Sequence, residues 1–265
     1  MRVYISLLRM RLIAGLQYRA AAWAGMLTQF AWGFMEILAF SAFYRANPNV
    51  FPMEFSHLVS YIWIQQAFLV LIMPWGGGVT SAEGIINGDI AYDLARPLDL
   101  YNRWFCEMVS SKVSSFLLRC GPLLLVAFFL PQPYRLMLPP SVFQFLLFFV
   151  SISLTLGVVT AYMLIDATTI FFTLSKYNVF LVISAEFFSG SYIPLPFFPD
   201  AIRRVVELSP FGAMANMPLR IYSGDIAGLD AAWGIGLQVF WLVVLVVFGK
   251  WLMRTALRRV VSQGG

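Results

Sequence analysis

The chain is 265 residues long, and 60% of its residues are hydrophobic while only 12% are charged. A soluble domain carries about 25% charged residues, so this chain has too few charges to cover the surface of a soluble globule. The composition argues against a soluble enzyme, a secreted domain and a disordered chain. It favours an all-α protein that crosses a membrane several times.

Residues 1–19 precede the first long apolar stretch and are predicted to form an interfacial helix. Their own apolar stretch is short and is interrupted by Arg9, Arg11 and Arg19, which does not fit the apolar region of a cleaved signal peptide. We therefore expect this helix to be retained and to lie along the membrane surface.

Stretches without charged residues locate the membrane spans, because a helix needs roughly 20 apolar residues to cross the hydrocarbon core. The sequence predicts six spans, at Ala21–Phe43, Ser56–Trp75, Cys106–Leu130, Ser141–Leu164, Ala167–Phe188 and Ala231–Lys250. No internal repeat or low-complexity linker separates them, so residues 1–265 are predicted to form a single membrane domain.

The basic residues indicate the orientation of these spans. With the N-terminus inside, ten basic residues lie in cytoplasmic segments, at Arg2, Arg9, Arg11, Arg19, Arg96, Arg103, Lys250, Arg254, Arg258 and Arg259. Five lie in external segments, at Arg45, Arg135, Arg203, Arg204 and Arg220. Because Lys and Arg are enriched on the cytoplasmic side, both termini are expected in the cytoplasm. This distribution accounts for the net charge of +5 without a nucleic-acid partner.

The cytoplasmic segment 76–104, between the second and third spans, is predicted to contain an amphipathic helix. Ile85, Ile90 and Leu94 form an apolar stripe at helical spacing, and Pro97 is expected to end the helix. The segment carries more acids than bases, namely Glu83, Asp89, Asp93 and Asp99 against Arg96 and Arg103. An anionic lipid surface would repel it, so a protein partner is favoured over an ordinary helix lying on lipid.

The external segment 189–230 is too irregular to be a span. Pro194, Pro196 and Pro199 cannot continue a helix, whereas Asp200 can cap a short helix that ends near Leu208. The apolar pieces that remain are too short to cross the membrane. We expect re-entrant or interfacial helices that form an external gate, since irregular backbone at membrane depth must be buried in protein or line a cavity.

Five ionisable residues fall within the predicted spans, at Glu36, Lys112, Arg119, Lys176 and Glu186. Lys112 and Arg119 are seven residues apart and share a helix face, and Glu36 lies at a depth that allows a pair with Arg119. Such residues either form interhelical pairs that hold the packing or line a cavity between protomers. The sequence does not distinguish these alternatives.

The sequence offers no catalytic or metal-binding constellation. Cys106 and Cys120 are too few for a four-ligand metal site, and we expect buried thiols. His57 is the only histidine, which excludes a zinc site with two histidine ligands. Gly249–Lys250 is followed by Trp251 instead of Ser or Thr, so no phosphate-binding loop is expected. We predict a protein without enzymatic activity or a cofactor of its own.

The two segments outside the spans carry a resemblance to a known family. Between the second and third spans, Glu83–Gly84 is followed by the stretch GDIAYDLARP at residues 88–97. The external segment contains Ser189–Gly190, Pro194, Pro199, Ser209–Pro210, Arg220 and Gly224. In order and position these elements resemble the membrane subunit of ABC transporters of the ABC-2 exporter type.

The resemblance implies a coupling helix at Ser81–Pro97 that sits in a groove of a separate ATPase, which binds ATP and Mg²⁺. The residues implied in this contact are Glu83, Gly84, Gly88, Asp89, Leu94, Arg96 and Pro97. Closure of the ATPase would move the helix and reshape a cavity between two permease chains, either two copies of this chain or this chain and a related one.

The resemblance also implies a bacterial inner-membrane exporter that moves an amphiphilic or hydrophobic substrate out of the cytoplasm by alternating access. The implied external gate contains Ser189, Gly190, Pro194, Pro199 and Pro210. Two other classes of function stay open. One is a non-transporting subunit that anchors or assembles a partner complex, and the other is an ion-coupled carrier with Glu36 as its acid. The substrate, and the choice between homodimer and heterodimer, are not encoded in these motifs.

Overall fold

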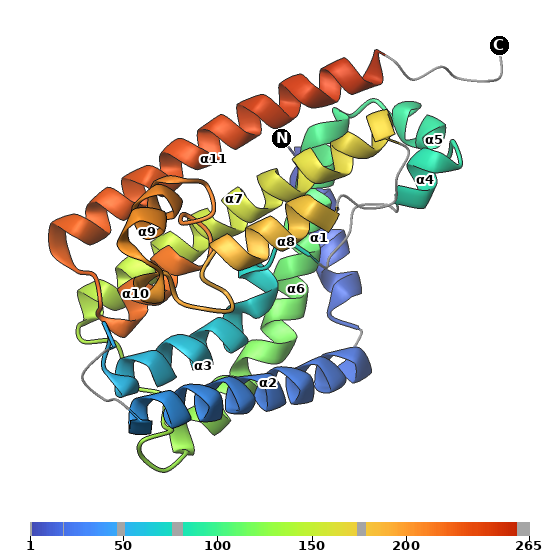
Figure 1. The fold of residues 1–265 in the computed structure, drawn as a ribbon. Helices are drawn as coiled ribbons and strands as arrows, with labels where there is room; N and C mark the ends of the chain where they lie inside the picture. Colours follow the sequence, from blue (N-terminus) through green and yellow to red (C-terminus); the bar gives the residue numbers. More distant parts are fainter. Residues whose placement is uncertain (1, 18, 47–50, 76–81, 174–178, 259–265) are drawn as a thin grey trace.

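The computed structural model of the chain describes residues 2–17, 19–46, 51–75, 82–173 and 179–258, and these residues form helices and loops without a strand. The helices are shown in Figure 1. They are α1 (Arg2–Gly15), α2 (Arg19–Ala46), α3 (Phe55–Ile72), α4 (Ala82–Ile86), α5 (Ile90–Leu94), α6 (Leu100–Phe129), α7 (Val142–Thr173), α8 (Val179–Phe188), α9 (Asp200–Leu208), α10 (Asn216–Ser223) and α11 (Gly228–Leu257).

Among the described residues, five helices are long and apolar enough to cross a membrane, namely α2, α3, α6, α7 and α11. Most of α3 is buried, whereas α2 and α11 expose much of their length. The exposed side chains of these two helices are large and apolar, including Trp32, Leu38, Val243 and Phe248. A continuous apolar exterior around a buried central helix is typical of a protein that spans a membrane.

The predicted break between the fourth and fifth spans, at Leu164–Ala167, is wrong. Helix α7 continues through Asp166 to Thr173, and the Thr168 hydroxyl donates a hydrogen bond of 2.6 Å to the Leu164 carbonyl inside the same helix. Neither Gly nor Pro occurs from residue 158 to residue 173, so nothing interrupts the backbone. The acidic side chain of Asp166 suggested a loop, yet a helix near its end accommodates such a residue.

The chain therefore does not show six full-length spans within its described residues. Helix α8 has 10 residues, which correspond to about 15 Å, or roughly half of the hydrocarbon core. The predicted span Ala167–Phe188 is divided between the end of α7 and α8. Residues 174–178 between them, with the predicted site residue Lys176, lie outside the described residues.

The predicted continuous coupling helix at Ser81–Pro97 is also wrong, because two short helices replace it. Helices α4 and α5 are separated by a turn at Asn87–Asp89, in which Gly88 has a φ of 84°. A positive φ favours glycine, so the Asn-Gly dipeptide forms a turn where the apolar spacing suggested a helix. Residues 76–81 lie outside the described residues.

Helix α6 begins at Leu100, six residues before the predicted third span, because Asp99 caps it. The Asn102 backbone N–H donates a hydrogen bond of 2.8 Å to Oδ1 of Asp99, which satisfies one of the free amides of the first turn. The last residues of the predicted segment 76–104 thus belong to a membrane-length helix.

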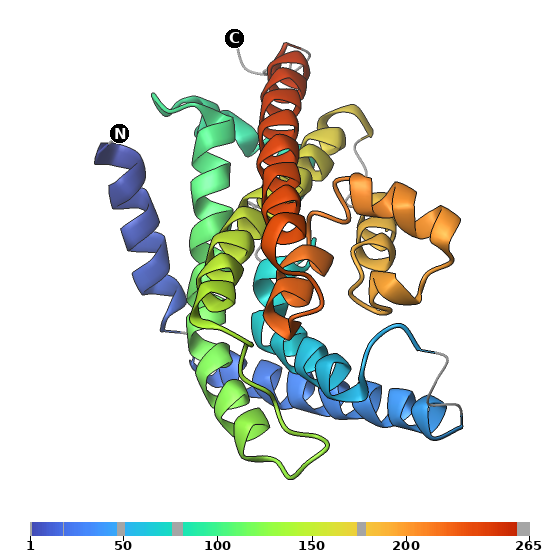
Figure 2. The ribbon, with the colours of Figure 1, turned by 90° about the vertical axis from the view of Figure 1, so that its left-hand side faces the viewer.

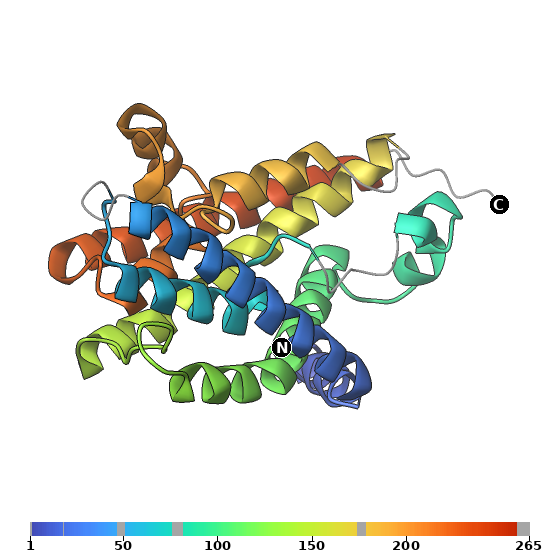
Figure 3. The ribbon, with the colours of Figure 1, turned by 60° about the horizontal axis from the view of Figure 1, so that its bottom comes forward.

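The helices place two groups of elements at opposite ends of the molecule. Helices α4 and α5 lie at one end, beside the last turns of α7 and α11, and α9 and α10 lie toward the other (Figures 1 and 3). Helix α1 begins and α11 ends on the α4–α5 side (Figure 2). This arrangement has the geometry expected if one end is cytoplasmic and the other external; their placement in a membrane remains a prediction.

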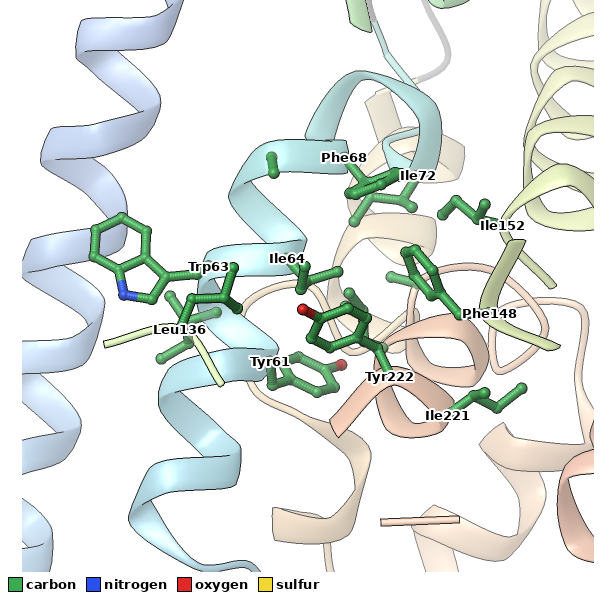
Figure 4. Close-up of a cluster of buried hydrophobic side chains, with 14 of the residues drawn as sticks. Tyr61, Trp63, Ile64, Phe68, Ile72, Leu136, Phe148, Ile152, Ile221 and Tyr222 are labelled. Atoms are coloured by element: carbon green, nitrogen blue, oxygen red, sulfur yellow. The ribbon is translucent and has the colours of Figure 1, made fainter. Parts of the chain in front are cut away.

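Part of the external segment is inserted into the bundle. Tyr222 of α10 points toward Tyr61 of α3 and Phe148 of α7 (Figure 4), and the rings of Phe148 and Tyr222 have their centroids 5.2 Å apart. The Tyr222 hydroxyl donates a hydrogen bond of 3.1 Å to the Met137 carbonyl, and burial raises the pKa of Tyr222 to about 12.

A buried glutamine joins this inserted segment to two long helices. Gln238 on α11 accepts a hydrogen bond of 2.8 Å from the Ser151 hydroxyl. Its amide nitrogen donates to the Thr155 hydroxyl and to the Ala213 carbonyl, both at 2.9 Å. Both polar atoms of the side chain are satisfied, and buried hydrogen bonds of this kind hold helices together in a membrane.

Candidate functional site

The α4–α5 corner, which we define as residues 84–97, has a buried side and an exposed side. Ile85 and Ile90 are buried in a cluster with side chains of α6 and α7. Ile86, Tyr92 and Leu94 are exposed, and Tyr92 exposes 76% of its surface. Exposed apolar side chains grouped at a chain corner are typical of a surface that binds another protein.

The corner brings together most of the residues that the resemblance implied in coupling. Gly84 is buried, while Gly88, Asp89, Leu94, Arg96 and Pro97 are exposed. Glu83 belongs to α4. These residues therefore share one corner of the molecule, and their contact with a partner remains a prediction.

A chain of buried ion pairs connects this corner to two helices. Arg103 of α6 lies 2.8 Å from Asp93 of α5 and 3.2 Å from Glu107 one turn further along α6. Glu107 in turn lies 3.1 Å from Arg11 of α1. The side chains of Asp93, Arg103 and Glu107 are at most 11% exposed, so solvent screens the two pairs of Arg103 only weakly. Arg11 is 49% exposed, so its pair with Glu107 is screened more.

The sequence did not predict this ion chain. Arg103 and Glu107 have the i, i+4 spacing of a helical ion pair, which is a local signal. Their partners Asp93 and Arg11 are set by tertiary packing, and the spacing along the chain does not reveal them. These ion pairs hold α5 in place relative to α6 and α1, at the end of the molecule that carries the exposed corner.

Lys112 has a structural role rather than a place in a cavity. Its ammonium nitrogen lies 2.8 Å from the Val70 carbonyl and 2.8 Å from the Met73 carbonyl, and its side chain is fully buried. The last carbonyls of a helix have no partner within the helix and carry the negative end of its dipole. Lys112 therefore caps the C-terminal end of α3.

A cavity of about 360 Å³ lies between α2, α3 and α6. Polar and apolar side chains both line it, although membrane-length helices form its walls. The polar residues that line it are Thr28, Gln29, Glu36, Gln65, Gln66, Arg119, Ser191 and Tyr192, and the larger apolar residues are Trp32, Leu69, Met73 and Trp75. Two of the predicted charge candidates, Glu36 and Arg119, thus line the same cavity.

Several polar atoms around the cavity are buried without a hydrogen-bond partner in the described part of the chain. They are both amide atoms of Gln29, one carboxylate oxygen of Glu36, the amide oxygens of Gln65 and Gln66, and Nε of Arg119. A buried polar atom without a partner destabilises the fold by about 1–3 kcal/mol. Their concentration in one cavity indicates a place where a further molecule completes the hydrogen bonds.

The suggested pair between Glu36 and Arg119 is absent from the described residues. Glu36 is hydrogen-bonded to Gln66. The Arg119 guanidinium lies against Gly25, where an added Cβ would collide with it. Gly25 and Glu36 are eleven residues apart on α2, which corresponds to about 16 Å along the helix. The two charges therefore lie toward different ends of the cavity.

The three glutamines were missed as site residues, although the sequence holds a signal for them. Gln29, Gln65 and Gln66 lie in otherwise apolar stretches, where a polar side chain needs a partner within the protein. Gln29 also shares one face of α2 with Gly25, Trp32 and Glu36, at the spacing of a helix. The prediction considered only charged residues within the spans and therefore did not include Gln29, Gln65 and Gln66.

Side-chain hydrogen bonds from α3 hold the segment 189–230, which is predicted to be external, to the bundle. The Tyr61 hydroxyl donates to the Gly190 carbonyl at 2.9 Å, and the Asn216 N–H donates to the Ser189 carbonyl at 2.9 Å. Gly190 has a φ of 82° and lies so close to Tyr61 that a side chain would crowd the hydroxyl. Gln65 donates to the Ser191 carbonyl, so the cavity ends against this segment.

The remaining residues of the predicted gate lie along the same segment. Pro194 precedes the short 3-10 helix Leu195–Phe197, Pro199 precedes α9, and Pro210 follows it. The carboxylate of Glu186 on α8 accepts a hydrogen bond of 3.2 Å from the Tyr192 hydroxyl. Their role in gating remains a prediction.

These features define a class of protein, namely an all-helical multi-pass membrane protein with a polar cavity between its spans. The sequence model of the ABC-2 family transporter proteins matches residues 30–264 of the chain. The chain therefore belongs to this family and is the membrane domain of a transporter, as the motifs indicated. No curated protein matches it.

Replacing Lys112 with Met is expected to lower the free energy of unfolding by about 1–3 kcal/mol, because the carbonyls of Val70 and Met73 lose their donor inside the protein. Thermal unfolding of the purified protein in mild detergent measures the change. Lys250→Met is the matched control. Lys250 lies near the end of α11, and its ammonium contacts the Tyr101 ring at 5.7 Å instead of capping the end of a helix. A Lys112→Met protein as stable as the wild type would contradict the capping role.

Replacing Arg103 with Met is expected to destabilise the protein by about 3–5 kcal/mol, because Asp93 is left as an unpaired buried charge. Arg203→Met is the control, because it removes an exposed pair with Asp200 that is worth below about 1 kcal/mol. The same thermal unfolding assay compares the two variants. Equal stability losses would show that the ion chain is no more important than a surface pair.

Proposed function

We propose that this chain is the permease subunit of an ATP-driven exporter in a bacterial inner membrane, with both termini in the cytoplasm. It works as a dimer with a second permease chain, either a copy of itself or a related protein. A separate ATPase binds ATP and Mg²⁺ and docks on the α4–α5 corner. The observation that carries this proposal is an exposed apolar corner that is tied by buried ion pairs to the membrane-length helix α6.

The ion chain supports a coupling role because it stiffens the connection behind the corner. Separating buried charges is costly, so the pair between Asp93 and Arg103 resists displacement of α5 relative to α6. A push on the exposed side is therefore transmitted to α6, and through Glu107 and Arg11 to α1. An ordinary surface loop would absorb the same push in its own backbone.

The cavity between α2, α3 and α6 suits a route for amphiphilic cargo. Its amides and its two charged residues supply hydrogen bonds to the polar part of a substrate, and its aromatic side chains contact the apolar part. Trp32 and Trp75 are 59% and 49% exposed. A second permease chain placed against this side would close the cavity, as the proposed dimer requires.

The docking surface is tested by replacing Tyr92 with Ala. Tagged wild-type protein, purified from its native host in mild detergent, is expected to retain an ATPase that is identified by mass spectrometry. The Tyr92→Ala variant is expected to retain about tenfold less of this ATPase. An exposed tyrosine at an interface often contributes about 1.4 kcal/mol or more to binding.

Phe129→Ala is the control for this experiment, since Phe129 is also 76% exposed but ends the 30-residue helix α6, about 45 Å from its start at the corner. Retention of the ATPase by Phe129→Ala and its loss from Tyr92→Ala supports the docking site. Purification of the wild type without any nucleotide-binding protein would favour the anchoring role instead.

The cavity is tested by a pair of glutamine substitutions that have opposite expectations. Gln29→Leu removes an amide without partners, so it is expected to preserve or raise thermal stability while it lowers transport about tenfold. Gln238→Leu removes a fully bonded amide and is expected to lower stability by about 1–3 kcal/mol. Transport is measured in inverted membrane vesicles, with whichever of a panel of cationic and anionic fluorescent amphiphiles the wild type moves. Wild-type transport by Gln29→Leu would exclude the cavity as the route.

A further inference from the structure

A second cavity, of about 510 Å³, lies at the other end of the molecule from the α4–α5 corner. It is an open cavity lined by α9, α10 and the beginning of α11, and it shares no lining residue with the cavity between α2, α3 and α6. Its polar lining consists of Arg203, Arg204, Glu207, Asn216, Arg220 and Asp230.

Most of the charges around the cavity are already neutralised. The Arg220 guanidinium donates to Glu207 at 2.7 Å and is also paired with Asp225. Arg203 is paired with Asp200 at 2.8 Å. Arg203, Glu207 and Arg220 form part of the wall of the cavity. Because their charges are already paired, they are little available to a ligand.

Three groups of the cavity lining stay unpaired in the described structure, namely one cation, one anion and one amide. Arg204 and Asp230 form no ion pair within the part of the chain that the structure describes. Asn216 is fully buried, and neither its Nδ2 nor its Oδ1 has a hydrogen-bond partner there. A buried amide with both atoms unsatisfied is costly and indicates a missing partner that both accepts and donates hydrogen bonds.

These leftover groups match a zwitterion better than a simple anion or cation. A phosphate or carboxylate group would accept from Arg204 and from Nδ2 of Asn216, whereas an ammonium group would donate to Asp230 and to Oδ1 of Asn216. A lone anion would face Asp230 and Glu207, and a lone cation would face the arginines. A ligand that carries both charges avoids either repulsion.

The rim of the cavity is apolar and exposed, which favours a lipid over a small soluble zwitterion. Trp233 and Leu208 line the cavity and are 69% and 56% exposed. The Trp241 indole donates to the Leu208 carbonyl at 2.9 Å, so a second tryptophan of α11 lies beside α9. Tryptophans next to charged groups are typical of the boundary between headgroups and acyl chains.

The geometry points to a binding site for the zwitterionic headgroup of an aminophospholipid from the outer leaflet. The headgroup lies between Arg204, Asn216 and Asp230, and the start of the acyl chains contacts Trp233 and the exposed side of α9. The lipid thereby bridges α9 to α11. The binding event involves this chain alone, so its test is independent of the proposed ATP-driven transport.

Delipidated full-length protein is titrated with phosphatidylethanolamine or phosphatidylglycerol in detergent, and bound lipid is counted by native mass spectrometry. Phosphatidylethanolamine is expected to bind at least about tenfold more tightly than phosphatidylglycerol. Asp230→Asn is expected to lose this preference, because Asp230 is the group that receives the ammonium. Arg204→Gln and Asn216→Leu are expected to weaken the binding of both lipids, and Asn216→Leu is expected to keep its thermal stability. Arg135→Gln, which removes another exposed arginine near the ring of Phe128, is expected to bind like the wild type.

Free phosphoethanolamine is added in a separate arm to distinguish the two sources of a zwitterion. Weak competition, at concentrations far above those of the lipid, is expected because the rim contacts are missing. Competition at equal concentrations would overturn the lipid assignment in favour of a soluble zwitterion. Equal binding of both lipids by the wild type, or an unchanged preference in Asp230→Asn, would overturn the site itself.

Discussion

Every polar group buried among membrane-length helices needs a partner inside the protein, because hydrocarbon supplies none. Lys112 meets this need for the final carbonyls of α3, and Gln238 meets it between α7, α11 and the turn before α10. The Tyr61 hydroxyl does the same for the backbone at Gly190. These bonds fix the buried helix α3 and the inserted external segment, and thereby the walls of the cavity between α2, α3 and α6.

The same constraint separates structural from functional polar residues. The polar atoms of Lys112 and Gln238 are hydrogen-bonded within the protein, and their substitution should affect stability first. Gln29, Glu36 and Arg119 have buried atoms without partners in the described structure, and they face one cavity. The ion chain from Arg11 to Asp93 belongs to the first group by its bonding. It contributes to the proposed function only by joining the exposed corner to α6 and α1.

The all-helical, multi-span architecture and the family were predictable from the sequence, because apolar length and two local motifs determine them. The continuation of α7 through Asp166 to Thr173 was not, since Asp166 resembled a loop residue although no glycine or proline breaks the helix there. The Asn87–Gly88 dipeptide indicates the turn between α4 and α5, but the apolar stripe around it favoured one continuous helix. In the site, Glu36 and Arg119 were identified by charge alone, and Gln29 could have been identified from its place on the same face of α2 as Glu36. The partners of Arg103 depend on which helices meet, and a single helix pattern does not contain that information.

In-cell photo-crosslinking from position 92 tests the central claim most directly, with benzoylphenylalanine in place of the exposed Tyr92 and mass spectrometry of the product. The account predicts a crosslink to a cytoplasmic protein that carries the Walker A and Walker B motifs of an ABC ATPase. The same probe in place of Leu138, which is 71% exposed in the loop after α6, should not capture that protein. Crosslinks from position 92 that are confined to lipid, or to a protein without a nucleotide-binding site, would contradict the account.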